Sequence, residues 1–156
     1  MAAKRIMALD PGTKRIGVAL SDEMGWTGQP LETIERTTLE ADVAHVRGLA
    51  QRHEVRELIV GLPIRMDGTE GPEAEQARLL IAALEQSLAL PVTPWDERLT
   101  SKLAEAVLIQ ADVGRKKRKG AIDRVAAALI LQSYLDARSG PAGTGDAPEA
   151  EPPAVS

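Results

Sequence analysis

The sequence predicts an α/β fold, in which a mixed five-stranded sheet carries helices on both faces. Three short strand-like segments come first with no helical period between them, so they are expected to form an antiparallel meander. Helical and apolar segments then alternate along the chain. This alternation indicates two crossovers, which add two parallel strands to the sheet.

The first two strands are expected at residues 5–10 and 15–21, on either side of the turn signal Pro11-Gly12. Asp10 ends the first strand, where rigid backbone would hold its carboxylate at the rim of the sheet with its oxygens toward solvent. Such a group is suited to a metal ion, but Asp before Pro-Gly is also ordinary turn chemistry. The hairpin alone leaves both interpretations open.

The spacing of apolar residues distinguishes the next three elements. Residues 28–37 contain an alternation of apolar and polar side chains, which predicts a strand with one solvated face. Residues 40–54 carry apolar side chains at steps of three and four, the pattern of an amphipathic helix. Residues 58–63 form a continuous apolar run, typical of a strand buried on both faces of a parallel sheet.

Proline positions define the following two elements. Pro72 is expected at the first position of a helix that Pro91 ends. Residues 92–97 have the pattern of a short strand. Pro94 lacks a backbone donor, and it therefore assigns this strand to an edge of the sheet or to a strand end.

The last third of the chain is expected to be helical on both sides of a basic loop. Thr100 or Ser101 caps one helix, a basic loop follows over residues 115–120, and a last helix covers residues 121–137.

The composition indicates one domain, residues 1–138, followed by an acidic tail, residues 139–156, whose Pro-, Ala- and Gly-rich composition predicts disorder. The net charge is −4, and the tail holds three acids and no base, so the body is near neutral and neither demands nor excludes nucleic acid. The absence of cysteine excludes disulfides and thiolate metal sites. No apolar run approaches the roughly 18 residues of a membrane span, so a cytoplasmic location is expected by default.

Three carboxylates are expected to meet at one rim of the sheet. Asp10 ends the first strand and Glu97 the last, and parallel strands direct their carboxyl ends to the side where ligands bind. Asp123, expected in the first turn of the last helix, can reach the same rim. Divalent cations would relieve the mutual repulsion of these groups, and all-oxygen ligands suit Mg²⁺ or Mn²⁺. Two such ions can support phosphodiester cleavage, and Asp96 is the reserve candidate for Glu97.

Each acid also has an ordinary interpretation. Asp123 would stabilise a helix N-terminus through the macrodipole, and Glu97 would pair with Arg98 at the surface. The placement of all three acids together favours the metal site.

Four motifs follow one another between residues 4 and 138. They are Asp10-Pro11-Gly12-Thr13-Lys14-Arg15-Ile16-Gly17-Val18-Ala19, Val60-Gly61-Leu62-Pro63 with Asp67-Gly68 and Gly71, Asp96-Glu97-Arg98-Leu99-Thr100, and Lys119 with Asp123-Arg124-Val125-Ala126-Ala127. The set resembles the YqgF/RuvX family of ribonuclease H-like, Holliday-junction-resolvase-like nucleases.

The resemblance implies a ribonuclease H-like fold and metal-dependent cleavage of structured nucleic acid. The substrates it implies are the 5′ end of the 16S ribosomal RNA precursor and branched DNA such as the Holliday junction. It carries the catalytic and metal-binding roles to Asp10, Glu97 and Asp123. Ala8 stands where the family usually has Gly, and Ser101 where a second Thr is usual.

Basic residues surround the expected site. They are Lys14, Arg15, Arg98 and the run Arg115, Lys116, Lys117, Arg118 and Lys119. The run is expected to bind phosphates, which makes affinity fall with salt. Each of the other three either holds a phosphate or offsets local acidity, and the guanidinium fork favours the first role for Arg98. The loop over residues 66–71, with Asp67 and Gly68, is either a flap over the substrate or an ordinary surface loop.

Two other functions compete with a nuclease. The segment Asp10-Pro11-Gly12-Thr13 also resembles the first phosphate loop of actin-like and sugar-kinase-like ATPases, but such enzymes need a second domain for which this chain has no room. A non-catalytic nucleic-acid or transcription-complex module of the same fold is the other alternative. The choice between RNA and DNA stays open, as does a homodimer matched to a two-fold symmetric junction.

Overall fold

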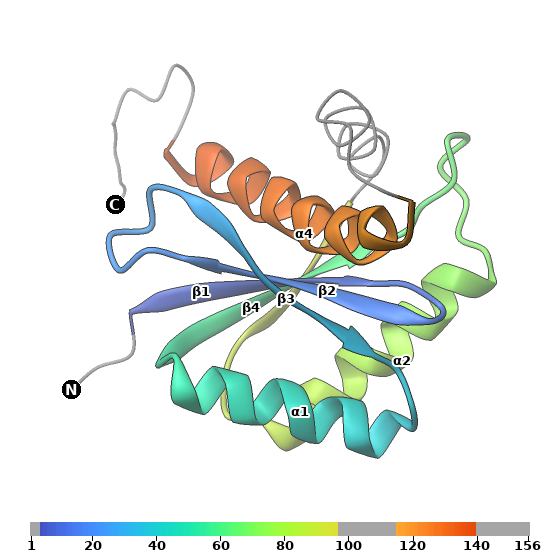
Figure 1. The fold of residues 1–156 in the computed structure, drawn as a ribbon, viewed down its shortest axis with the longest axis horizontal. Helices are drawn as coiled ribbons and strands as arrows, with labels where there is room; N and C mark the ends of the chain where they lie inside the picture. Colours follow the sequence, from blue (N-terminus) through green and yellow to red (C-terminus); the bar gives the residue numbers. More distant parts are fainter. Residues whose placement is uncertain (1–3, 97–114, 140–156) are drawn as a thin grey trace.

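Five strands form one sheet in the order β3-β2-β1-β4-β5 (Figure 1). The structure is a computed structural model that describes residues 4–96 and 115–139. The strands are β1 (Arg5–Pro11), β2 (Arg15–Ser21), β3 (Gly28–Glu35), β4 (Val55–Leu62) and β5 (Val92–Asp96). The helices are α1 (Leu39–Arg52), α2 (Pro72–Ser87) and α4 (Arg115–Ser139). The helix expected after Thr100 and the tail expected to be disordered lie outside the described residues.

The pairing of the strands confirms the expected mixed sheet. Strand β2 is antiparallel to both β1 and β3, so the chain begins as a meander. Strand β4 is parallel to β1 and to β5, as its continuous apolar sequence predicts. Strand β5 is one of the two edge strands, and an edge is one of the two positions predicted from Pro94.

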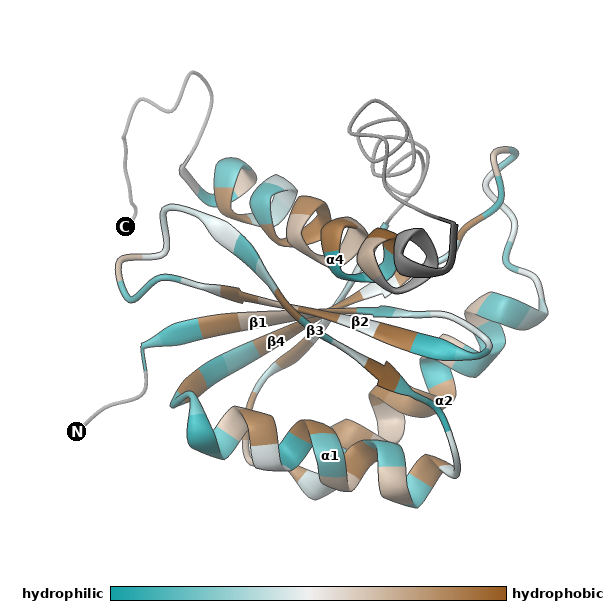
Figure 2. Ribbon diagram, in the orientation of Figure 1, coloured by the Kyte–Doolittle hydropathy of each residue, from teal (hydrophilic) through white to brown (hydrophobic). Residues whose placement is uncertain are grey.

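Helices cover both faces of the sheet: α4 lies on one face, and α1 and α2 lie on the other (Figure 1). Side chains along β1 alternate between these layers. Met7 and Leu9 belong to the core under α1 and α2, whereas Ile6 and Ala8 belong to the core under α4. In Figure 2 the apolar stripes of the helices lie toward the sheet.

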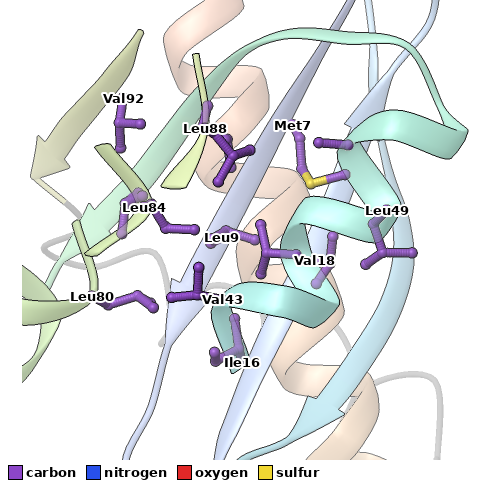
Figure 3. Packing of buried hydrophobic residues seen from close by; sticks show 14 of the residues in the cluster. Met7, Leu9, Ile16, Val18, Val43, Leu49, Leu80, Leu84, Leu88 and Val92 are labelled. Carbon is purple, nitrogen blue, oxygen red and sulfur yellow. The ribbon is translucent and has the colours of Figure 1, made fainter. Parts of the chain in front are cut away.

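The core under α1 and α2 is built from apolar side chains of these two helices and of all five strands (Figure 3). Leu80 and Leu84 of α2 and Val46 of α1 are completely buried there. Burial of one such side chain contributes about 1.5–3 kcal/mol, which is why these helices bind the sheet firmly. Within residues 4–96 and 115–139, no helix combines the length and the apolar character needed to cross a membrane.

The beginning of α4 differs from the sequence expectation. The run 115–120, expected as a loop, is part of the helix, which therefore starts six residues before Ala121. Lys and Arg are good helix formers, and Gly120 inside a helix costs only about 1 kcal/mol, so the basic run extends the helix. Asp123 is consequently two turns inside α4, and the macrodipole interpretation of this residue is wrong, because that effect is confined to the first turn.

The end of β3 also differs slightly from expectation. The strand stops at Glu35 because Thr38 caps α1: its Oγ1 accepts a hydrogen bond from the amide of Ala41 at 3.1 Å. The residues between β3 and α1, expected to continue the strand, instead lead the chain from the sheet into the helix.

Candidate nuclease site

A pocket of about 760 Å³ lies where β1 and β4 end, beside the first halves of α1 and α2. Asp10 of β1 and Asp123 of α4 both line it. This is the rim formed by the carboxyl ends of the parallel strands, the place where α/β sheets usually bind ligands. The fold therefore brings together two acids from opposite ends of the described chain.

Asp10 is more buried than the sequence predicts. It was expected to direct its oxygens toward solvent, but only 8% of the residue is exposed. The reason is that side chains of α1, α2 and α4 surround the end of β1, as the lining of the pocket shows. Burial of a carboxylate is costly unless it is compensated by a cation or by hydrogen bonds, so this position suits a metal ligand.

Asp123 forms an ion pair across the β2–α4 contact. Arg15 Nε donates to Asp123 Oδ2 at 2.9 Å, and the two side chains are 25% and 21% exposed. Burial raises the pKa of Asp123, and the Arg15 hydrogen bond and charge partly oppose that shift. Of the two roles expected for Arg15, the geometry matches the one in which it offsets local acidity.

Gly17 sets how closely α4 approaches the sheet. A Cβ atom built on Gly17 would lie 1.8 Å from the carbonyl oxygen of Asp123, which no real contact permits. The backbone of α4 therefore rests directly on β2 at the level of Asp123. Sequence reasoning included Gly17 in a motif but gave it no role. A glycine inside a strand pattern is a signal of such a close approach.

Arg36 and the buried Asp42 form an ion pair at the pocket that sequence reasoning missed. Arg36 Nε donates to Asp42 Oδ2 at 3.1 Å, and its Nη1 donates to the carbonyl of Gly12 at 2.9 Å. The amide of Thr37 donates to Asp42 Oδ1 at 3.2 Å. Asp42 is only 2% exposed. An aspartate on the apolar face of a helix pattern, as here next to Val43, is the signal that could have found it, because buried acids are almost always paired.

Asp96, the reserve candidate, ends β5 on the other side of the sheet from Asp10. Trp95 stacks edge-on against Tyr134 of α4, with ring centroids 5.3 Å apart, so Trp95 lies on the α4 face. Alternation along the strand then places Asp96 on the opposite face. Asp10 shares the α4 face with Ile6 and Ala8. Asp96 is exposed and is not among the described residues that line the pocket.

Several expected site residues lie outside what the structure describes. Glu97 and Arg98 are not described, and for Arg115, Lys116, Lys117, Arg118 and Lys119 only the helical backbone is. Lys14 is exposed in the turn between β1 and β2, and its carbonyl accepts a hydrogen bond from the amide of Arg36 at 2.9 Å.

The loop after β4 is a hydrogen-bonded turn. Asp67 Oδ1 accepts from the amide and the hydroxyl of Thr69 at 2.9 and 2.7 Å, and these bonds lower the pKa of Asp67. Gly68 has a φ of 90°, which the turn requires. Glu70 forms a two-pronged ion pair with Arg78 of α2. Neither Asp67 nor Gly68 is among the described residues that line the pocket.

The donor set of the pocket fits hard divalent cations. Four of its described lining residues are acidic, Asp10, Asp42, Glu73 and Asp123, and one, Arg36, is basic. Carboxylate oxygens are the ligands that Mg²⁺ and Mn²⁺ prefer. Within residues 4–96 and 115–139, no three His, Cys, Asp or Glu side chains converge closely enough to hold an ion by themselves.

Solved structures with the same architecture are resolvases. Thermus thermophilus RuvC in complex with a Holliday junction substrate aligns with a TM-score of 0.56 and 16% identity over 87% of this chain and 96% of that one. The fowlpox virus Holliday junction resolvase aligns with a TM-score of 0.55 and 17% identity, over 86% and 99%. At such identity the likeness concerns the fold alone. The fold that this chain shares with them is the ribonuclease H-like fold.

The chain belongs to the RuvX family, because the family model described as "RuvX: Holliday junction resolvase" matches residues 4–137. A relative from Halothermothrix orenii is 56% identical over 132 residues, which are 85% of this chain and 94% of that protein. A relative from Myxococcus xanthus is 50% identical over 137 residues, 88% and 91% of the two chains. Both carry the name "Putative pre-16S rRNA nuclease". The family resemblance expected from the four motifs is confirmed.

Proposed function

We propose that this protein is a divalent-metal-dependent nuclease that hydrolyses phosphodiester bonds in structured nucleic acid. The observation that carries the proposal is the meeting of Asp10 and Asp123 in one pocket at the carboxyl ends of β1 and β4. A buried strand-end carboxylate and a second acid with a raised pKa form a site that a cation would stabilise. Membership in the RuvX family supports the same activity.

The proposed metal ligands are Asp10, Asp123 and Glu97. Trp95 and Asp10 both lie on the α4 face of the sheet. Side chains two residues apart along a strand point to the same face, so a strand continued past Asp96 would direct Glu97 to the face of Asp10. This supports Glu97 over Asp96 as the third ligand. Two bound Mg²⁺ or Mn²⁺ ions would activate water and stabilise the leaving oxygen of the phosphodiester. Arg15 would hold Asp123 in place through their ion pair, and Gly17 would let α4 come close enough for it to do so.

The proposed nucleic-acid contacts are the basic residues around this rim. Lys14 is exposed beside the turn that follows Asp10, and Arg98 and the run from Arg115 to Lys119 adjoin the other two proposed ligands in the sequence. Lysine and arginine bind phosphates irrespective of base sequence, so recognition would depend on shape and charge.

The names of the relatives make the 16S ribosomal RNA precursor the first substrate to test, and the family description makes the Holliday junction the second. A cytoplasmic location and a homodimer on a two-fold symmetric junction are part of the same proposal.

Asp10→Asn is the direct test. Wild type and variant are incubated with a precursor ribosomal RNA and a four-way junction, in Mg²⁺, in Mn²⁺ and in excess chelator. We expect cleavage by the wild type in either metal, none in chelator, and a loss of at least about 100-fold in Asp10→Asn, with the circular dichroism spectrum unchanged. Glu85→Gln, an exposed change elsewhere on α2, is the control.

Unchanged cleavage by Asp10→Asn would contradict the proposal. Binding of either substrate without turnover in any divalent metal would favour the alternative, a non-catalytic module of the same fold.

A further inference from the structure

One wall of the pocket contains none of the three proposed metal ligands and none of the buried core residues. Glu73, Gln76 and Leu79 of α2 line the pocket at steps of three residues. The core-facing side of the same helix is formed by other residues, namely Ala74, Ala77, Leu80, Ile81 and Leu84. Leu79 is 52% exposed, so a large apolar side chain is presented to the pocket without a partner in the core.

The charge of the pocket limits what can bind against this wall. Its described lining has four acids and one base, and that base, Arg36, already pairs with the buried Asp42. The nearby Arg15 pairs with Asp123. A phosphate pressed against the wall would meet a lining whose described residues carry more acidic than basic groups, whereas a neutral planar group would meet no such repulsion.

We propose that the wall formed by Glu73, Gln76 and Leu79 is a subsite for an unpaired nucleobase of the substrate. The inference rests on the proposed nuclease function, because the base belongs to a nucleotide next to the phosphodiester that reaches Asp10. The pocket volume of about 760 Å³ is within the range of roughly 300–1,000 Å³ typical of sites that enclose a small organic ligand. It is therefore large enough to hold one base beside the metal-binding acids.

Each side chain of the wall has a chemical role toward a base. Leu79 supplies apolar contact to a ring face, and the Gln76 amide can donate to and accept from a base edge. An ionised Glu73 carboxylate can only accept hydrogen bonds, and it therefore favours a base with an exocyclic amine. Opening a pair to free such a base costs energy in a continuous duplex. The preferred substrate is consequently one with an unpaired or easily opened nucleotide beside the cleavage position.

Two measurements test the subsite. The first compares KM and kcat on a fully paired duplex and on the same duplex with one unpaired nucleotide, each in RNA and in DNA. We expect the wild type to prefer the unpaired form about tenfold or more in kcat/KM. Leu79→Ala and Gln76→Ala should each raise KM for the unpaired form several-fold, up to about tenfold, with kcat little changed.

Matched controls keep the kinetic test specific. Gln86→Ala changes another exposed glutamine of α2, and Met24→Ala changes another exposed apolar residue, 68% exposed, between β2 and β3. Neither residue is among the described lining of the pocket, and neither variant should change KM. Melting temperatures of all four variants report any loss of folding.

The second measurement needs no cleavage. The unpaired nucleotide is replaced by 2-aminopurine, whose fluorescence changes when the base leaves the stack, and binding is followed in chelator. We expect the fluorescence to change on binding of wild type and of both controls. With Leu79→Ala we expect this fluorescence change to be no more than half as large.

The two measurements separate the two proposals. Cleavage with equal KM in all variants, together with no fluorescence difference between wild type and Leu79→Ala, would overturn the subsite and leave the nuclease in place. A fluorescence change that Leu79→Ala reduces, without cleavage in any metal, would support the subsite and overturn the nuclease. Absence of both signals would overturn both.

Discussion

Arg36 links the turn after Asp10 to helix α1 through hydrogen bonds. It bonds the carbonyl of Gly12 in the turn after β1 and the carboxylate of Asp42 in α1, and its own amide bonds Lys14. The guanidinium therefore joins the turn after β1 to α1, because its planar fork of donors reaches both acceptors. The turn that follows Asp10 is held from the side of α1 as well as by the strand.

Removing one partner of this ion pair should be costly. Arg36→Gln leaves the buried Asp42 carboxylate without its cation, and we expect a loss of about 3–5 kcal/mol in the free energy of unfolding. The double variant Arg36→Gln/Asp42→Asn should recover part of that loss, because no buried charge is then left alone. Urea denaturation measures all three changes. Arg47→Gln, whose hydrogen bond to Ser87 is exposed, is the control and should cost less than about 1 kcal/mol.

Tyr134 offers a test of stability against pH. Its hydroxyl donates to Glu57 Oε2 at 2.7 Å, and burial, followed by the bond and charge of Glu57, raises the pKa of Tyr134 to about 12. The folded protein then holds this proton more tightly than the unfolded chain does. The contribution of Tyr134 to the free energy of unfolding is therefore complete below pH 10 and is lost as the pH rises toward 12.

The variant Tyr134→Phe has no such proton. Its free energy of unfolding should therefore decline less steeply than that of the wild type between pH 10 and pH 12, as measured by urea denaturation at fixed pH. Parallel curves for the two proteins would show that the pKa of Tyr134 is not raised in the folded state.

The packing of α4 on β2 is the contact between elements that matters most for the site. It delivers Asp123 to the pocket, and it depends on Gly17, since any side chain there would meet the helix backbone. A second bond from α4 to the sheet, Arg124 Nη1 to Thr33 Oγ1 at 3.1 Å, fixes the helix over β3.

Two glycines give a matched test of this contact. Gly17→Ala must displace α4, and we expect a loss of about 1–3 kcal/mol in the free energy of unfolding together with loss of cleavage. Gly48→Ala in α1 has nothing within 4 Å of its new Cβ, and we expect it to stabilise the protein by about 0.5–1 kcal/mol. Denaturation and cleavage assays on both variants check the pair. Equal stability of Gly17→Ala and wild type would contradict the close approach of the helix.

For the molecule as a whole, the net charge is small, but basic and acidic residues gather in separate local clusters. The net charge is −4, yet the basic run from Arg115 to Lys119 precedes Asp123, one acid of the pocket, along α4. Local clusters of cations, and not the overall field, would then attract a polyanion.

Salt dependence should report these contacts. The logarithm of the binding constant for either substrate should fall linearly with the logarithm of salt concentration. Replacing Lys116 and Lys117 by Gln should reduce the slope by about 0.7–0.9 for each lysine that contacts a phosphate. Filter binding or fluorescence anisotropy at several salt concentrations measures the slope. An unchanged slope would show that these lysines do not contact phosphates of the substrate.

Local sequence was sufficient to predict the elements and their order. The turn at Pro11-Gly12, the continuous apolar run of β4, Pro72 at the start of α2 and Pro94 in an edge strand each act over a few residues. The start of α4 was predicted wrongly, because a cluster of like charges resembles a loop although each residue favours a helix.

The sequence by itself determined the order of the strands along the chain, the family and the position of Asp10 at the end of β1, since apolar period and turn residues act locally. The order of the strands within the sheet came from the tertiary structure. Only the tertiary structure decided which groups meet at the end of β1: Arg15 with Asp123, Arg36 with Asp42, and residues of α2 with Asp10 in the lining of one pocket. Partners of this kind belong to different elements, and their distances depend on how helices pack on the sheet. A single packing fact, the bare backbone of Gly17 under α4, controls where Asp123 lies.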